Sequence, residues 1–299
     1  MKKWSTKVVL GIITSAAVSA GCLVYAYFIE PNRLVINEST ITIKHLNPAF
    51  DGMRIVMLGD IHGGSNGVTE EKLRQVVATI NEQNADIVVL LGDYVSEKYF
   101  EGPPAGRELR MPAATIADNL AGIRAVFGVY AVLGNHDGDY GPDVVAGELT
   151  RVGYKVLQNE IAFVERNAQR LRIYGMTDHL SLKGGWIRTS EESRSNLSTT
   201  TGDVIVLQHG PDILPVIAGE YSISPELRLI LAAHTHGGQV RLPILGSPIV
   251  PSGYGQKYVR GHIKEKGVDM FVTTGLGCSI LPFRFMVPPE IVVLTVRAD

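Results

Sequence analysis

Five short apolar runs in this chain each end in a polar group of a type that binds metals, and this pattern restricts the folds available to it. The runs are residues 54–58, 86–91, 128–133, 203–207 and 227–233. They are followed in order by Asp60-Ile61-His62, Gly92-Asp93, Gly134-Asn135-His136-Asp137, Gln208-His209 and His234-Thr235-His236. Continuous apolar runs of this length are typical of strands that are buried on both faces of a sheet. Because ligands of such sheets lie beyond the carboxyl ends of the strands, we expect these polar groups to meet at one edge.

Helical segments separate the first three runs, which predicts an α/β fold. In residues 69–83 the apolar side chains Leu73, Val76, Val77 and Ile80 recur at helical spacing, and Thr69 is a candidate N-cap. Residues 113–124 form a second expected helix. This β-α-β order implies a parallel sheet with helices on its faces. Later segments (239–242, 258–263, 270–273 and 290–296) are expected to close a second, largely antiparallel set of strands.

The N-terminus has the composition of a membrane segment. Lys2, Lys3 and Lys7 precede an uncharged run of 22 residues, 8–29, which as a helix is long enough to span a hydrocarbon core of about 30 Å. Residues 1–30 are therefore expected to be an uncleaved transmembrane helix. A cleaved signal peptide and a lipoprotein signal with Cys22 lipidated are the alternatives. The positive-inside rule puts the remaining domain, residues 31–299, outside the cytoplasm as part of a single-pass protein of the cell membrane.

Composition excludes several classes of protein. The 299 residues are 45% hydrophobic and 19% charged, with a formal net charge of −2, so the chain is globular and carries no basic stripe for nucleic acid. Its two cysteines allow no disulfide framework. We expect neither a nucleic-acid partner nor a protein partner.

The polar groups after the apolar runs form a plausible set of metal ligands with no thiolate. They are Asp60, His62, Asp93, Asn135, His209, His234 and His236. Mixed nitrogen and oxygen ligands favour Mn, Fe, Zn, Co or Ni over Ca and Mg. Two such cations can stabilise the attacking and leaving oxygens of a displacement at phosphorus, and His136 could protonate the leaving oxygen. Taken singly, an Asp at a strand end is more often a turn residue than a ligand, and a buried His is more often a core residue. His45, His179 and His262 do not follow an apolar run in this way, and we expect them to be structural or surface residues.

The ordered set resembles the signature of the calcineurin-like metallophosphoesterases over roughly residues 54–296. The resemblance implies that Asp60, His62 and His236 hold one metal, that Asn135, His209 and His234 hold the second, that Asp93 bridges the two, and that His136 is the catalytic histidine. It also implies a four-layer αββα sandwich of two mixed sheets flanked by helices.

Two positions depart from the family pattern. Ser96 stands where a second Asp is usual, and Ala233 stands where a Gly is usual. The N-terminal segment and the sequences around residues 51–55, 274–277 and 288–290 resemble bacterial membrane-associated phosphodiesterases, including the UDP-2,3-diacylglucosamine pyrophosphatase type and a cell-wall-associated relative. Arg284 is a candidate contact to the substrate phosphate, with a structural role as the alternative.

The leading hypothesis is a hydrolase of phosphodiester or pyrophosphate bonds that acts on a lipid-linked or envelope substrate. A phosphatase of phosphomonoesters or phosphoproteins and a non-catalytic metal-binding scaffold are the alternatives. Intact Asp93, Asn135 and His136 argue against the scaffold. A cytoplasmic nucleotide-lipid substrate conflicts with the predicted topology, and we give the topology more weight because lysines precede the span and Glu30 follows it.

Overall fold

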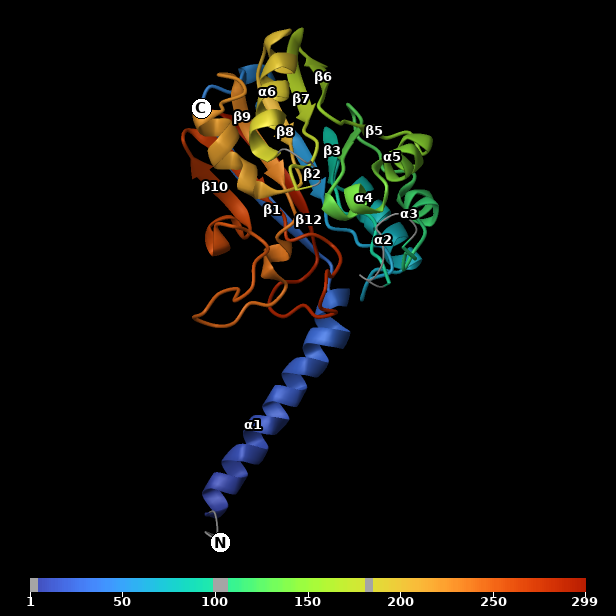
Figure 1. The fold of residues 1–299 in the computed structure, drawn as a ribbon, viewed down its shortest axis with the longest axis vertical. Coiled ribbons are helices and arrows are strands. Elements are labelled where there is room, and N and C mark those ends of the chain that lie inside the picture. Colours follow the sequence, from blue (N-terminus) through green and yellow to red (C-terminus); the bar gives the residue numbers. More distant parts are fainter. Residues whose placement is uncertain (1–4, 99–106, 181–184) are drawn as a thin grey trace.

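Two mixed sheets lie face to face in the computed structural model, which describes residues 5–98, 107–180 and 185–299 (Figure 1). The strands of the first sheet, in spatial order, are β1 (Val35–Ile43), β12 (Glu290–Ala298), β2 (Arg54–Leu58), β3 (Ile87–Leu91), β4 (Val129–Val132) and β5 (Lys155–Val156). Those of the second are β10 (Gly261–Glu265), β11 (Val268–Val272), β9 (Leu227–Ala232), β8 (Val204–Leu207), β7 (Gln169–Gly175) and β6 (Glu160–Arg166).

Alternate residues of each strand fill different layers of the core. In β2, Ile55 and Met57 join the cluster between the two sheets, whereas Val56 and Leu58 join the cluster under the helices, as the two-residue repeat of a strand requires. The helices α2 (Glu70–Asn81), α3 (Ala113–Leu120) and α5 (Pro142–Arg151) cover the first sheet, and α6 (Gly185–Ser198) covers the second. The predicted four-layer αββα sandwich is confirmed.

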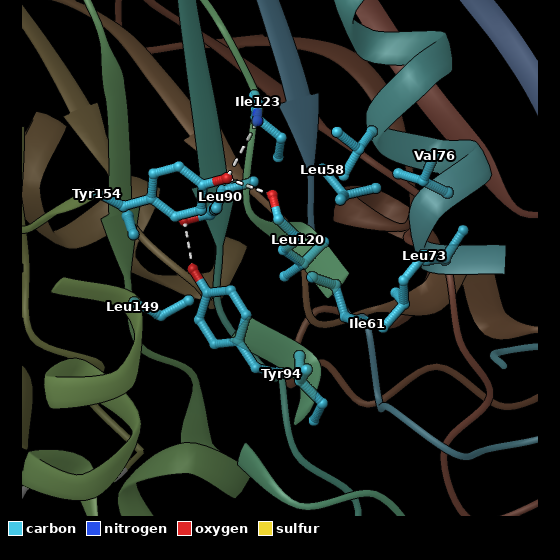
Figure 2. Packing of buried hydrophobic residues seen from close by; sticks show 14 of the residues in the cluster. Leu58, Ile61, Leu73, Val76, Leu90, Tyr94, Leu120, Ile123, Leu149 and Tyr154 are labelled. Carbon is cyan, nitrogen blue, oxygen red and sulfur yellow. Dashed lines mark hydrogen bonds between the residues drawn. The ribbon is translucent and has the colours of Figure 1, made fainter. Parts of the chain in front are cut away.

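The ends of the predicted helices are set by polar contacts. Helix α2 begins after Thr69, whose hydroxyl accepts a hydrogen bond from Lys72 N, as expected of an N-cap. Helix α3 ends at Leu120, earlier than predicted, because Ala121 leaves the helical conformation with a ψ of 144°; Gly122 then adopts a positive φ of 90°. Figure 2 shows the buried hydroxyl of Tyr154 there, donating to Leu120 O and accepting from Ile123 N.

Two expectations about the second set of strands are wrong. Strands β7, β8, β9 and β11 pair in parallel, and only the outer strands β6 and β10 are antiparallel to their neighbours. Strand β12 pairs with β1 and β2 in the first sheet. Within the described chain, residues 239–242 contribute only isolated bridges such as Val240–Phe285. An apolar pattern predicts that a segment is a strand, but it carries no information on the partner strand.

One apolar helix leaves the domain at its N-terminal end (Figure 1). Helix α1 (Thr6–Val24) continues through the turns Tyr25–Ile29 and Glu30–Asn32. The resulting 27-residue span has a mean hydropathy of 2.0, long and apolar enough to cross a membrane, a test that a signal sequence would also pass. Lys2 and Lys3 lie outside the described residues. Ala26, Glu30 and Pro31 are buried, so the last turns of this span pack on the domain.

Candidate metal centre

The predicted ligands meet at one edge of the sandwich. Asp60, Asp93 and Asn135 follow strands β2, β3 and β4 of the first sheet. His209 follows β8, and His234 and His236 follow β9, in the second sheet. The site is therefore built from the carboxyl ends of strands of both sheets, where parallel sheets generally bind ligands.

The side chains form two adjoining groups. In the first, His62 Nε2 lies 3.2 Å from His236 Nε2, and His236 Nε2 lies 3.8 Å from Asp60 Oδ1. In the second, His234 Nδ1 lies 3.2 Å from His209 Nε2. Asp93 belongs to both, because its Oδ2 lies 3.6 Å from His62 Nε2 and 3.2 Å from His209 Nε2. Each group brings at least three ligand atoms close enough to share one ion.

Orphaned polar atoms show that this donor set fits cations. Asp60 Oδ2 and Asn135 Oδ1 are buried, and neither has a hydrogen-bond partner among the residues described. Leaving a buried oxygen unpaired costs free energy, whereas coordination of a cation would satisfy both atoms. Since the set mixes imidazole, carboxylate and amide groups, divalent transition metals match it best.

The histidine rings are held in the form that binds metal. The Nδ1 atoms of His62, His209 and His236 face the carbonyl oxygens of Val95, Leu91 and Gly277 at 3.2, 2.7 and 3.3 Å. A proton on each Nδ1 leaves the Nε2 lone pair directed into the site. Burial lowers the pKa of His62 to about 4 and that of His234 to about 3, which favours the neutral ligand form of these two rings. His209 differs: although burial alone would lower its pKa, the Asp93 carboxylate raises that pKa well above the usual value.

Five of the seven candidate ligands have a left-handed backbone. The φ angles are 48° at Asp60, 45° at His62, 55° at Asp93, 72° at His234 and 51° at His236. Such angles are uncommon in non-glycine residues. They persist only where surrounding structure imposes them, and they cluster at functional sites.

Glycines allow the ligand loops to approach one another closely. A Cβ on Gly134 would lie 2.2 Å from Asp93 Oδ1, and one on Gly277 would lie 2.3 Å from Ile61 O. A Cβ on Gly59 would lie 2.7 Å from Cβ of Ala233, the position that departs from the family pattern. These glycines therefore do more than form turns.

His136 lies beside the first group and is paired with a buried acid that the sequence reasoning missed. Its ring is 5.0 Å from that of His62, and its Nδ1 is 3.1 Å from Glu97 Oε2. Although burial alone would lower the pKa of His136, the Asp93 and Glu97 carboxylates raise it to about 9. The sequence offered one signal for this pair: Glu97 is an acidic residue directly after Ser96, the position where the family usually has a second Asp.

Asp137 is a second residue whose role the sequence did not reveal. Its carboxylate is fully buried and accepts hydrogen bonds from the backbone N–H groups of Asp93, Tyr94, Val95 and Gly134. It thereby fixes the loop after β3 to the loop after β4.

Arg284 is not positioned as a phosphate contact. It is completely buried, and its guanidinium donates to the carbonyl oxygens of Thr274, Gly275, Gly277 and Val287. These bonds hold together the loop that lies against Asp60 and His62. Arg284 therefore has the structural role that was the alternative, in place of the expected contact to the substrate phosphate.

Of the three histidines set aside, His179 lies nearest to the centre. Its ring is buried, lies tilted against that of Trp186 with the ring centroids 4.1 Å apart, and has Nδ1 3.0 Å from Gln208 Nε2. His262 pairs with Asp269 at 2.7 Å.

The αββα sandwich and the candidate metal ligands gathered at one of its edges are the features expected of a metal-dependent hydrolase. Residues 53–238 match the model of the calcineurin-like phosphoesterase family, and the chain belongs to that family. It is a hydrolase that acts on phosphoric esters, and the family uses divalent metal ions.

Curated relatives extend over most of the chain. The chain is 30% identical to the uncharacterized metallophosphoesterase YkuE of Bacillus subtilis, covering 100% of this chain and 99% of that protein. It is 26% identical to the phosphodiesterase YaeI of Escherichia coli, covering 90% and 91%. It is 30% identical to a zebrafish transmembrane protein with a metallophosphoesterase domain, covering 95% of this chain and 61% of that protein.

Proposed function

We propose that the chain hydrolyses phosphodiester or pyrophosphate bonds at a centre of two divalent transition metal ions. The observation that carries the proposal is Asp93, whose Oδ2 lies between His62 Nε2 and His209 Nε2. Asp60, His62 and His236 would hold one ion, and Asn135, His209 and His234 the other. Bound ions would activate water and stabilise negative charge at phosphorus.

His136 supplies the proton for the leaving oxygen in this proposal. Its raised pKa keeps the imidazole protonated at neutral pH, as a general acid requires. Glu97 orients the ring by accepting a hydrogen bond from Nδ1, which directs Nε2 away from Glu97. Asp93 Oδ1 accepts from the backbone N–H of His136 at 2.9 Å, which ties the acid to the metal ligands.

The natural substrate is proposed to be membrane- or envelope-associated, with a lipid-linked phosphoester as the leading candidate. The apolar span at Thr6–Asn32 supports anchoring in the cell membrane, and the lysines before it support an extracytoplasmic domain. The names of the zebrafish and E. coli relatives agree with a membrane location and with diester cleavage.

Metal reconstitution tests the proposal. The full chain would be purified in detergent, stripped of metal and reloaded with Mn, Fe, Zn, Co, Ni or Mg. A transition metal should restore hydrolysis of bis-(p-nitrophenyl) phosphate in preference to p-nitrophenyl phosphate. Asp93→Asn should lose metal, whereas His136→Ala should keep metal and lose about 10²–10⁴-fold in kcat. Preference for the monoester would support the phosphomonoesterase, and metal binding without turnover would support the scaffold.

A further inference from the structure

Two loops beside the metal-binding edge expose large apolar side chains. The first loop, residues 239–254, follows His236; the second, residues 277–287, joins β11 to β12. The exposed fractions are 105% for Ile244, 67% for Leu245, 74% for Ile249, 82% for Ile280, 48% for Leu281 and 49% for Met286. Single exposed apolar residues are ordinary, but a concentration of them marks an interaction site.

Three of these side chains are also held in an unfavourable backbone conformation. The φ angles are 71° at Ile244, 60° at Ile280 and 56° at Met286. A β-branched residue in this region is an outlier, because glycine or asparagine adopts it at lower cost. Such a conformation persists where structure or function imposes it, and the apolar side chains exposed at these loop tips point to an apolar environment around them.

The two loops are bonded to each other and to the end of the apolar helix. Arg241 N donates to Phe285 O at 2.8 Å, and Arg284 N donates to Ala26 O at 3.0 Å. Asn66 Nδ2 donates to both Tyr27 O (2.7 Å) and Pro282 O (2.8 Å). The loops therefore lie at the end of the domain from which α1 leaves (Figure 1).

The charge of these loops suits an anionic lipid surface. Residues 237–264 contain no acidic residue. Arg241 lies in the first loop and Arg260 lies close to it, whereas Lys257 and Lys264 are paired with Glu265 and Asp269. Residues 276–289 also lack an acidic residue. Basic residues beside a membrane span are attracted to anionic headgroups.

We propose that residues 239–254 and 277–287 form a membrane collar, whose apolar tips insert into the bilayer that α1 spans. The collar rests on the membrane location proposed above and goes further, because it fixes which face of the domain meets the lipid. The second loop also contacts a candidate ligand, because Gly277 O faces His236 Nδ1, and the two loops are joined by the bond from Gln239 Nε2 to Leu281 O at 2.9 Å. The candidate centre would then lie close to the lipid surface, where a lipid-linked phosphoester is presented.

Quenching by lipid measures this insertion directly. The full chain carrying Cys22→Ser and either Ile244→Cys or Ile280→Cys would be labelled with an environment-sensitive fluorophore and reconstituted into phosphatidylcholine–phosphatidylglycerol vesicles with brominated acyl chains. Cys278 is buried, so it should escape labelling. Val126→Cys is the matched control, because Val126 is 73% exposed and precedes β4, at the opposite edge of the sheet from the metal-binding loops.

Apolar side chains of interfacial segments are buried about 5–10 Å into the boundary between headgroups and acyl chains. Insertion therefore predicts a blue-shifted emission and quenching by the brominated lipid at positions 244 and 280, with neither at 126. Water-like emission at 244 and 280 would overturn the proposal. A blue-shifted emission without quenching would mean that protein, such as a second copy of the chain, covers the label. That result would also overturn the proposed insertion. Thermal unfolding of each labelled variant checks its fold. Turnover of bis-(p-nitrophenyl) phosphate by the unlabelled wild-type chain tests the proposed function separately.

Discussion

At the scale of single residues, the four bonds to Asp137 test how the ligand loops are held. In Asp137→Asn an amide NH₂ would face backbone N–H donors, so at least one buried donor would lose its partner, at a cost of about 1–3 kcal/mol. We expect a lower unfolding midpoint and weaker metal binding. Asp139→Asn, an exposed acid on the same short helix, should leave both unchanged. Equal metal binding by wild type and Asp137→Asn would show that the loops do not depend on this carboxylate.

Glu97 permits a pH test of the proposed acid. Because the Asp93 and Glu97 carboxylates raise the pKa of His136, the protonated form persists to higher pH, and activity should fall as the pH rises through that pKa. Glu97→Gln removes one charge, so this alkaline limb of kcat should move to lower pH, with a loss of about ten-fold in kcat and unchanged metal content. Glu108→Gln, an exposed acid nearby, is the control. An unshifted pH profile would refute the role of Glu97.

At the scale of elements, the local sequence pattern was enough to predict the strands that precede the candidate ligands. The runs that became β2, β3, β4, β8 and β9 are buried on both faces, and Asp60, Asp93 and Asn135 lie where the strand ends predicted. Strand β12 was assigned to the wrong sheet because pairing depends on contacts between residues far apart in sequence. The Glu97–His136 pair was missed for the same reason, since 39 residues separate its partners.

The close packing of Gly277, in the loop after β11, leads to a testable prediction about metal affinity. A Cβ on Gly277 would lie 2.3 Å from Ile61 O and 2.9 Å from His62 Cβ, so Gly277→Ala must displace the segment that carries His62. Metal affinity should fall about ten- to a hundred-fold, as for other changes behind metal ligands. Gly147→Ala, where a Cβ meets nothing within 4 Å, should bind metal as wild type does in titrations of the metal-free protein. Equal affinities for the two variants would contradict this account.

At the scale of the whole molecule, the candidate centre joins the two halves of the sandwich. Asp60, Asp93 and Asn135 extend from the first sheet, and His209, His234 and His236 extend from the second. Bound cations would therefore fasten the sheets together at one edge. Without them, buried like charges and orphaned oxygens face one another; burial, for example, raises the pKa of Asp60 to about 7.

Metal removal should consequently destabilise the entire domain. One ion at a hundred times its Kd adds about 2.7 kcal/mol to the free energy of unfolding, and for a domain of this size each kcal/mol raises Tm by about 2–4 °C. We expect Tm of the full chain in detergent to fall by about 5–10 °C for each ion removed by chelation, and to recover when Mn or Zn is restored. In Asp93→Asn the restoring effect should be largely lost, because this carboxylate lies between both groups of ligands. If Asp93→Asn recovered as fully as wild type, the cations would bind elsewhere, and the assignment of Asp93 as the shared ligand would be wrong.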